Sequence, residues 1–138
     1  DLPGMEINAF VPGSTDTSGS EIWMLSPRID LRDLASPTVQ FQVDRRFRPA
    51  DPGLEAYDMV TSTDYNGRNF AGAKWHRFVP GYDAITADDP GTDGFSDTGM
   101  LSLAGFEGQQ ITIAFVYRAG SPGTNDATIL RIGHLDVQ

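Results

Sequence analysis

Apolar and polar residues alternate with a period of two in several short runs, and this pattern constrains the fold more than any other feature. Val39, Phe41 and Val43 alternate with glutamines and an aspartate, while residues 110–118 carry apolar side chains in both phases. Alternation places every second side chain on one face of a β-strand, whereas a helix needs a period of about 3.6 residues. No long segment has the helical period, so the chain is predicted to be all-β.

Glycines and prolines divide these runs into about eight or nine short strands, the pattern of an antiparallel β-sandwich or jelly roll. Residues 110–118 are expected to form a central strand, because both of its faces are apolar. Gly133 is expected to mark a β-bulge, because the apolar phase changes there. Residues 74–79 are predicted to be a strand and residues 80–97 a loop. The length of 138 residues fits one domain spanning residues 1–138.

A Ser26-Pro27 break interrupts an apolar run, and the alternation resumes at residues 29–31. Proline has no N–H to donate to a sheet, so Pro27 belongs at a strand end, a sheet edge or a bulge. The stretch is therefore interpreted as two strand pieces joined by a corner. Trp23 and Trp75 both lie in strand patterns and are expected in the core.

The composition excludes several classes of function. The net charge is −9, and Lys74 is the only lysine among the 10 basic residues. Nucleic acid is a poor partner for such an acidic chain, because binding to phosphates needs a basic surface. No apolar run approaches the roughly 18 residues that cross a bilayer, so no membrane insertion is expected. The absence of cysteine excludes disulfides and cysteine chemistry.

Four motifs follow one another in an order that is typical of one family. They are WMLSPRIDL at residues 23–31, a strand ending in STDYNG within residues 54–67, Trp75, and LSLAGFEGQQITIAFVYRAG at residues 101–120. In this order they resemble the cleaved-adhesin or choice-of-anchor J jelly-roll domains of bacterial, Bacteroidetes-like surface proteins. The likeness covers most of the chain from residue 21 onward.

The resemblance implies a galactose-binding-like β-sandwich without catalytic machinery. It also implies a secreted or cell-surface protein, in which this domain is a monomeric module of a larger chain, such as a lipoprotein anchored elsewhere. One position departs from the family pattern. The aspartate associated with a structural calcium in such folds is replaced by Gly133, which puts a family-type calcium site in doubt.

Acidic residues in turn-forming stretches are candidate calcium ligands, because calcium takes several carboxylate or carbonyl oxygens. Asp89 and Asp93 lie in one such stretch, and Asp16 and Glu21 lie in another. Glu21 with Asp136 is a third candidate pair if their strands are neighbours. Acidic residues also form ordinary turns, which is the simpler interpretation of both stretches.

Arg45, Arg46 and Arg48 form the basic cluster of this acidic chain. A planar guanidinium pairs with a carboxylate or sulfate through two hydrogen bonds, so an acidic sugar is a candidate ligand. The alternative is that these arginines pair with the protein's own acids at a strand end.

Aromatic residues in loop-like stretches are candidates for stacking on sugars; they are Tyr65, Phe70, Tyr82 and Phe95. The alternative is that these rings are plugs over the ends of the sandwich. Catalysis is not expected. The two histidines, His76 and His134, lie in strand-like segments, and no Gly-x-Ser-x-Gly elbow or zinc motif is present.

The sequence thus predicts a non-catalytic extracellular binding or adhesion module. It would recognise a glycan or a protein surface through loops at residues 13–20, 45–53 and 80–97. The alternative is a structural spacer domain of a larger surface lipoprotein or secreted enzyme, stabilised by calcium in one version. A glycosidase ranks third, because paired carboxylates cannot be located from the sequence.

Overall fold

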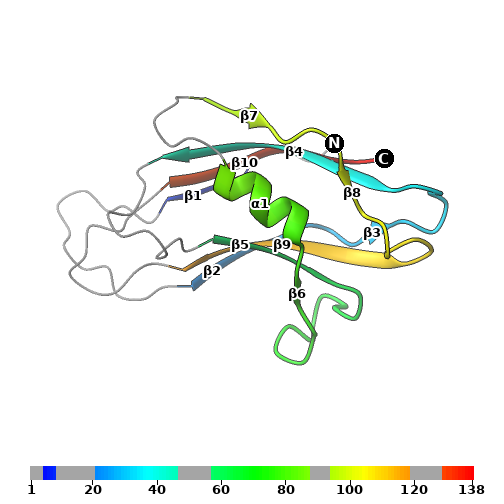
Figure 1. Cartoon of the computed structure of the whole chain (residues 1–138). Coiled ribbons are helices and arrows are strands. Elements are labelled where there is room, and N and C mark those ends of the chain that lie inside the picture. The colour runs from blue at the N-terminus through cyan, green and yellow to red at the C-terminus, as the bar shows by residue number, and fades with distance from the viewer. Residues whose placement is uncertain (1–4, 9–20, 47–56, 88–93, 119–128) are drawn as a thin grey trace.

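The computed structural model describes residues 5–8, 21–46, 57–87, 94–118 and 129–138. Within these segments, two five-stranded antiparallel sheets face each other and one short helix lies at their side (Figure 1). The described residues therefore form an all-β sandwich, and the fold class predicted from the alternation is confirmed. None of the helical structure in these segments has the length and apolar character needed to cross a membrane.

The first sheet has the order β1–β10–β4, and two short strands, β7 and β8, pair with β4. Its strands are β1 (Met5–Asn8), β4 (Thr38–Arg46), β7 (Ser96–Asp97), β8 (Leu101–Ser102) and β10 (Ile129–Val137). The pairing of β10 with β4 shifts between Gly133 and Asp136. His134, inside this irregularity, has a φ of 49°. The bulge predicted at Gly133 is confirmed.

The second sheet has the order β2–β9–β5–β6, and β3 also pairs with β9. Its strands are β2 (Glu21–Leu25), β3 (Ile29–Asp30), β5 (Tyr57–Ser62), β6 (His76–Arg77) and β9 (Gln110–Arg118). As predicted, β9 is central, with strands on both sides. Leu25 pairs with Ala114 and Ile29 with Ile111, so residues 26–28 bulge away from β9 between them. The position predicted for Pro27, in a bulge on an edge strand, is confirmed.

The main core lies between the two sheets and consists of their inward-facing apolar side chains. Phe41 of β4 and Phe115 of β9 meet across it with ring centroids 5.3 Å apart, and both are fully buried. On the same strand, Ala114 and Val116 point the other way and are also buried, in a second cluster on the outer face of the second sheet. The second sheet is therefore covered on both faces.

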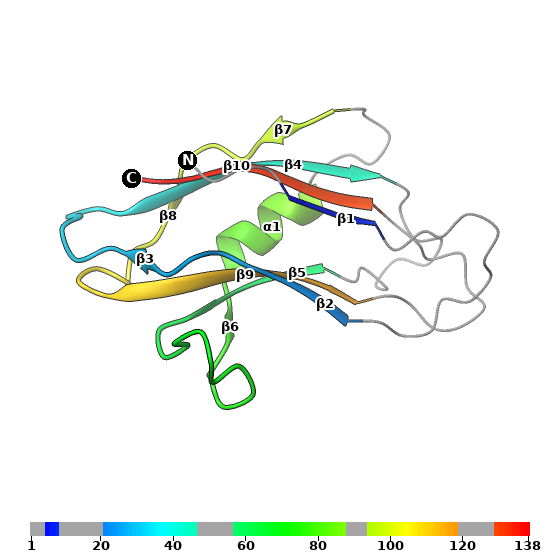
Figure 2. The same cartoon turned by 180° about the vertical axis from the view of Figure 1, so that it is seen from behind.

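A helix, α1 (Val79–Ala87), replaces part of the loop predicted at residues 80–97, and β7 replaces another part. Both views place α1 along the open side between the sheets (Figures 1 and 2). Ile85 anchors it in the core with 1% of its surface exposed. Pro80 and Gly81 are typical of loops, but proline is tolerated in the first turn of a helix. The N–H groups of that turn have no acceptor within the helix, so proline removes no hydrogen bond there. The loop prediction was wrong for this reason.

Two further predictions are corrected. The strand expected at residues 74–79 is only the two-residue β6, because the chain enters α1 at Val79. Trp23 and Trp75 are half-buried and pack on the second cluster rather than in the core between the sheets. Trp23 pairs with Val116, which faces outward, and alternation alone does not say which face of a doubly covered sheet is the core.

Candidate functional site

A groove of about 280 Å³ lies on the outer face of the second sheet, beside the bulge of residues 26–28. The residues around it come from three places: the bulge, the loop after β5, and β9. The lining residues include Ser26, Pro27, Arg28, Tyr65, Asn66 and Thr112. We refer to it as the bulge groove.

Ser26 shapes one wall of the bulge groove. Its backbone N–H donates to the carbonyl of Ile113 at 2.8 Å, and its hydroxyl accepts from the N–H of Ile113 at 3.0 Å. The hydroxyl also donates to the carbonyl of Pro27 at 2.8 Å. A side chain thus replaces the backbone acceptor that a regular strand would offer to Ile113. The chain can leave β9 for the length of the bulge without an unpaired buried N–H.

The loop after β5 forms the opposite wall, and its own side chains hold it in place. The Ser62 hydroxyl donates to the Asp64 carboxylate at 2.7 Å and accepts from the N–H of Tyr65 at 3.1 Å. The Asp64 carboxylate also accepts from the N–H of Lys74 at 2.9 Å. These hydrogen bonds, first that from Ser62 and then that from Lys74, lower the pKa of Asp64. The loop therefore presents Tyr65 at a defined position.

Tyr65 belongs to a group of four rings that we call the outer aromatic cluster: Trp23, Tyr65, Phe70 and Trp75. The Tyr65 and Trp75 centroids are 5.3 Å apart, as are those of Trp23 and Trp75. Phe70 packs edge-on against Trp23 at 5.0 Å and keeps 42% of its surface exposed. The indole N–H of Trp75 is buried and has no hydrogen-bond partner among the described residues. The cluster fixes the Tyr65 ring beside the bulge groove.

Thr112 lines the bulge groove from β9, and only 2% of its surface is exposed. Among the described residues, the buried side-chain polar atom without a hydrogen-bond partner is the Trp75 indole nitrogen, so the Thr112 hydroxyl is not an unsatisfied buried group. The bulge groove combines an aromatic ring, a hydroxyl and the exposed Arg28, a combination suited to a small polar ligand.

The structure separates the four aromatic residues predicted to stack on sugars: Phe70 packs near Tyr65 in the outer aromatic cluster, and the other two lie elsewhere. Tyr65 lies at the bulge groove, whereas Tyr82 lies in α1 with the Arg77 guanidinium 4.1 Å from its ring centroid. Phe95 covers the outer face of the first sheet, where its ring is 3.3 Å from the position that a Cβ on Gly133 would take. Tyr82 and Phe95 therefore lie away from Tyr65, which is the one of the four that lines the groove.

The predicted basic cluster lies partly outside the described residues. Arg45 and Arg46 end β4, where they pair with Leu130 and Ile129 of β10, and Arg48 lies outside the described segments. A ligand-binding role for these arginines stays a prediction.

The predicted calcium ligands do not form a described site. Asp16, Asp89 and Asp93 lie outside the described residues. Glu21 and Asp136 are on β2 and β10, which belong to different sheets, so the idea that their strands are neighbours was wrong. In the segments that the structure describes, no group of three or more His, Asp or Glu side chains is placed to hold a metal ion. Calcium binding by the acidic stretches stays a prediction.

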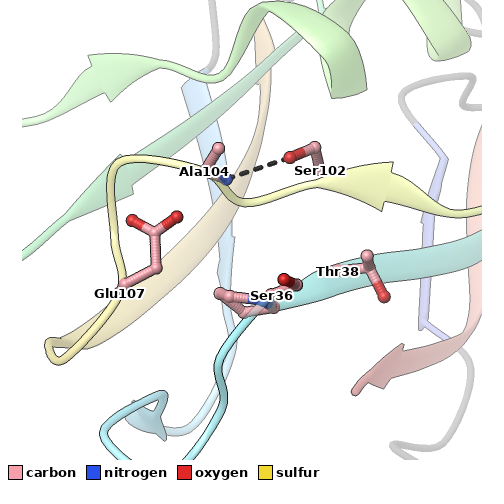
Figure 3. Close-up of a pocket in the computed structure, with 6 residues that line it drawn as sticks. Ser36, Thr38, Ser102, Ala104 and Glu107 are labelled. Atoms are coloured by element: carbon pink, nitrogen blue, oxygen red, sulfur yellow. Dashed lines mark hydrogen bonds between the residues drawn. The ribbon is translucent and has the colours of Figure 1, made fainter.

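Another pocket, of about 140 Å³, lies where β4 begins. Figure 3 shows Ser36 and Thr38 on the segment that enters β4, with Ser102 and Glu107 on the neighbouring segment around β8. The Ser102 hydroxyl accepts from the N–H of Ala104 at 3.1 Å, and Glu107 accepts from the N–H of Gly105 at 2.7 Å. Both acceptors already stabilise their own turns, so this pocket is the weaker candidate.

Sequence reasoning missed Arg28 and Thr112. The available signal was Thr112 itself, a polar residue in the otherwise apolar stretch of β9 from Ile111 to Tyr117. Comparison with models of known protein families and with curated proteins finds no match to this chain.

Proposed function

We propose that this protein is a non-catalytic glycan-binding module and that a sugar residue binds in the bulge groove. The observation that carries the proposal is that the Tyr65 ring and the Thr112 hydroxyl line the same groove. Sugars offer an apolar face to an aromatic ring and hydroxyls to polar groups, so the two features suit one ligand.

Binding rather than hydrolysis is supported by the residues around the bulge groove. A glycosidase uses two carboxylates that flank the scissile bond, about 5–9 Å apart. None of the described residues that line the groove is acidic, and none is a histidine. This arrangement can hold a sugar but offers no general acid or base.

The sequence resemblance supports an extracellular location for the proposed glycan-binding module. If the chain is a choice-of-anchor J type domain, it is a jelly roll of the galactose-binding-like type, secreted or at the cell surface as one module of a larger protein. The module would then give that protein its adhesion to a glycan. The spacer interpretation differs because it requires no ligand.

Tryptophan fluorescence offers a direct test, because both tryptophans of the chain belong with Tyr65 to the outer aromatic cluster. A glycan array would select ligands, and a fluorescence titration would measure their affinity. Thr112→Val removes the hydroxyl while keeping the shape and β-branching of the side chain. We expect it to weaken binding by about three- to tenfold, the value of one hydrogen bond, without lowering the melting temperature.

Thr61→Val is the matched control. Thr61 lies on the neighbouring strand β5 and is also 2% exposed, but it does not line the groove. Its substitution should leave affinity unchanged. If no glycan changes the fluorescence, or if both variants bind as the native protein does, the groove is not the binding site and the spacer interpretation gains support.

A further inference from the structure

The five arginines whose side chains the structure describes, at positions 28, 32, 68, 77 and 131, fall into two groups. Three have a carboxylate partner, at 2.7, 2.9 and 3.6 Å respectively: Arg32 with Asp30, Arg77 with Asp58, and Arg131 with Asp44. Arg28 and Arg68 have no ion pair or side-chain hydrogen bond within these segments. Both are exposed. In a chain of net charge −9, guanidinium groups without a carboxylate partner are unexpected.

One of the two unpaired arginines, Arg28, lines the bulge groove, and the other, Arg68, follows the lining residue Gly67 in the sequence. Of the neighbouring carboxylates, Asp30 is paired with the Arg32 side chain through two hydrogen bonds. Asp64 keeps its negative charge but is held by the Ser62 hydroxyl and the Lys74 N–H. None of the described residues that line the groove is acidic, so the charged side chain in its wall is Arg28.

We propose that the glycan bound in the bulge groove carries an anionic group, a carboxylate or a sulfate ester, which Arg28 holds while Arg68 adds a second positive charge. This inference rests on the proposed glycan-binding function and narrows its ligand class. A guanidinium donates two parallel hydrogen bonds to such an oxyanion, which gives orientation as well as affinity. The Thr112 hydroxyl and the Tyr65 ring then contact the rest of the sugar.

The net negative charge of the protein does not prevent an anion from binding in the groove. Charges on the rest of the surface are screened beyond about 8 Å at physiological ionic strength, so an anion in the groove is influenced mainly by the groove's own residues. A long polyanion would still be repelled by the remaining surface. We therefore expect recognition of single acidic residues or short acidic oligosaccharides.

The test compares charged sugars with their uncharged counterparts by tryptophan fluorescence. The probe pairs are trigalacturonate and its methyl ester, sialyllactose and lactose, and sulfated lactose and lactose. We expect at least one charged member to bind about tenfold more tightly than its counterpart, as for a hydrogen bond to a charged group. The first pair reports on a planar carboxylate, and the last reports on a sulfate. Raising the salt concentration should weaken only the charged members.

The variants assign the preference to Arg28. Arg28→Gln should bind both members of a pair with similar affinity, and Arg68→Gln should reduce the preference by about threefold, as for a charge at longer range. Arg131→Gln is the charge control: it changes the net charge equally, and Arg131 lies on β10 of the other sheet, paired with Asp44, and does not line the groove. It should keep the full preference. Melting temperatures of all variants confirm that each one folds.

The outcomes separate this inference from the proposal beneath it. If charged and uncharged members bind equally, or if Arg28→Gln weakens both members alike, the anionic ligand class is overturned while glycan binding stands. If Arg131→Gln removes the preference as Arg28→Gln does, Arg28 is not the contact. If no probe and no glycan on the array binds, the proposed function itself fails.

Discussion

The hydroxyl of Ser26 accepts a hydrogen bond from the backbone N–H of Ile113 at 3.0 Å, at the point where the edge of the second sheet departs from β9. Ile113 is fully buried, so its N–H has no access to water. The serine side chain therefore completes the hydrogen bonding that the bulge would otherwise interrupt. Pro27, which has no N–H, is tolerated at the next position, because no acceptor on β9 needs a hydrogen bond from residue 27.

Replacing Ser26 with alanine should lower the free energy of unfolding by about 1–3 kcal/mol, because the Ile113 N–H would be buried without an acceptor. The measurement is urea denaturation followed by circular dichroism. Ser102→Ala is the control, since that hydroxyl also accepts a backbone N–H but lies at an exposed turn. A loss no larger for Ser26→Ala than for Ser102→Ala would show that the hydroxyl does not support the bulge.

The sheets could be predicted from the sequence because alternation and its interruptions are local signals. The phase change at Gly133 and the proline at position 27 both mark bulges, and both bulges are present. The helix α1 could not be predicted in this way. Its sequence contains Pro80 and Gly81, and its position is determined by burial of Ile85 between the sheets, which is a tertiary effect.

The candidate site was predictable only in part. Tyr65 was identified because an aromatic ring in a turn-forming stretch is a chemical signal in itself. The positions of Phe95 and Tyr82, on other parts of the surface, depend on how the segments pack. Arg28 was missed because the absence of an ion pair is a property of the whole structure. A sequence shows which charges exist but not which carboxylates lie within reach of them.

Gly81→Ala should destabilise the protein although alanine favours helices. A Cβ at this position would overlap with the Met59 sulfur and lie 2.8 Å from Cδ2 of Phe78, and both side chains are buried. Overpacking costs about 1–3 kcal/mol, against a gain of about 1 kcal/mol from helix propensity. We expect a net loss of up to about 2 kcal/mol by denaturant unfolding.

Gly72→Ala is the control for this prediction, because its added Cβ would be 3.8 Å from the nearest atom, the Asn69 carbonyl oxygen. Its stability should stay within about 0.5 kcal/mol of the native value. Equal effects of the two substitutions would show that the helix can move away from β5.

The ion pair of Arg77 with Asp58 should matter more than that of Arg32 with Asp30. Arg77 donates to both carboxylate oxygens of Asp58, at 2.9 and 3.2 Å, and the Asp58 side chain is only 10% exposed, against 45% for Asp30. Removal of Arg77 leaves a carboxylate that water hydrates poorly. Arg77→Gln should therefore lower the melting temperature by about 2–6 °C, and Arg32→Gln by less than about 2 °C. Equal shifts would show that Asp58 is hydrated when Arg77 is absent.

Acid should destabilise the protein below about pH 4, through carboxylates whose pKa is lower in the folded state. The Arg32 guanidinium lowers the pKa of Asp30, mainly by hydrogen bonding, and the Ser62 hydroxyl followed by the Lys74 N–H lowers that of Asp64. Unfolding returns both groups toward their ordinary value of 3.8. The unfolded chain then takes up protons that the folded chain does not. The stabilisation is present in full above that value and is lost as the pH falls through the lower, folded-state pKa values.

Asp64→Asn tests this mechanism, because asparagine keeps an oxygen acceptor for Ser62 and Lys74 but does not titrate. Urea midpoints measured from pH 7 to about pH 2.5 should fall less steeply for the variant than for the native protein, since one source of differential protonation is gone. Asp30→Asn should flatten the curve in the same pH range, and the double variant should flatten it further. Parallel curves for native protein and variants would place the acid sensitivity in other carboxylates, because a group that does not change its pKa on unfolding contributes no slope.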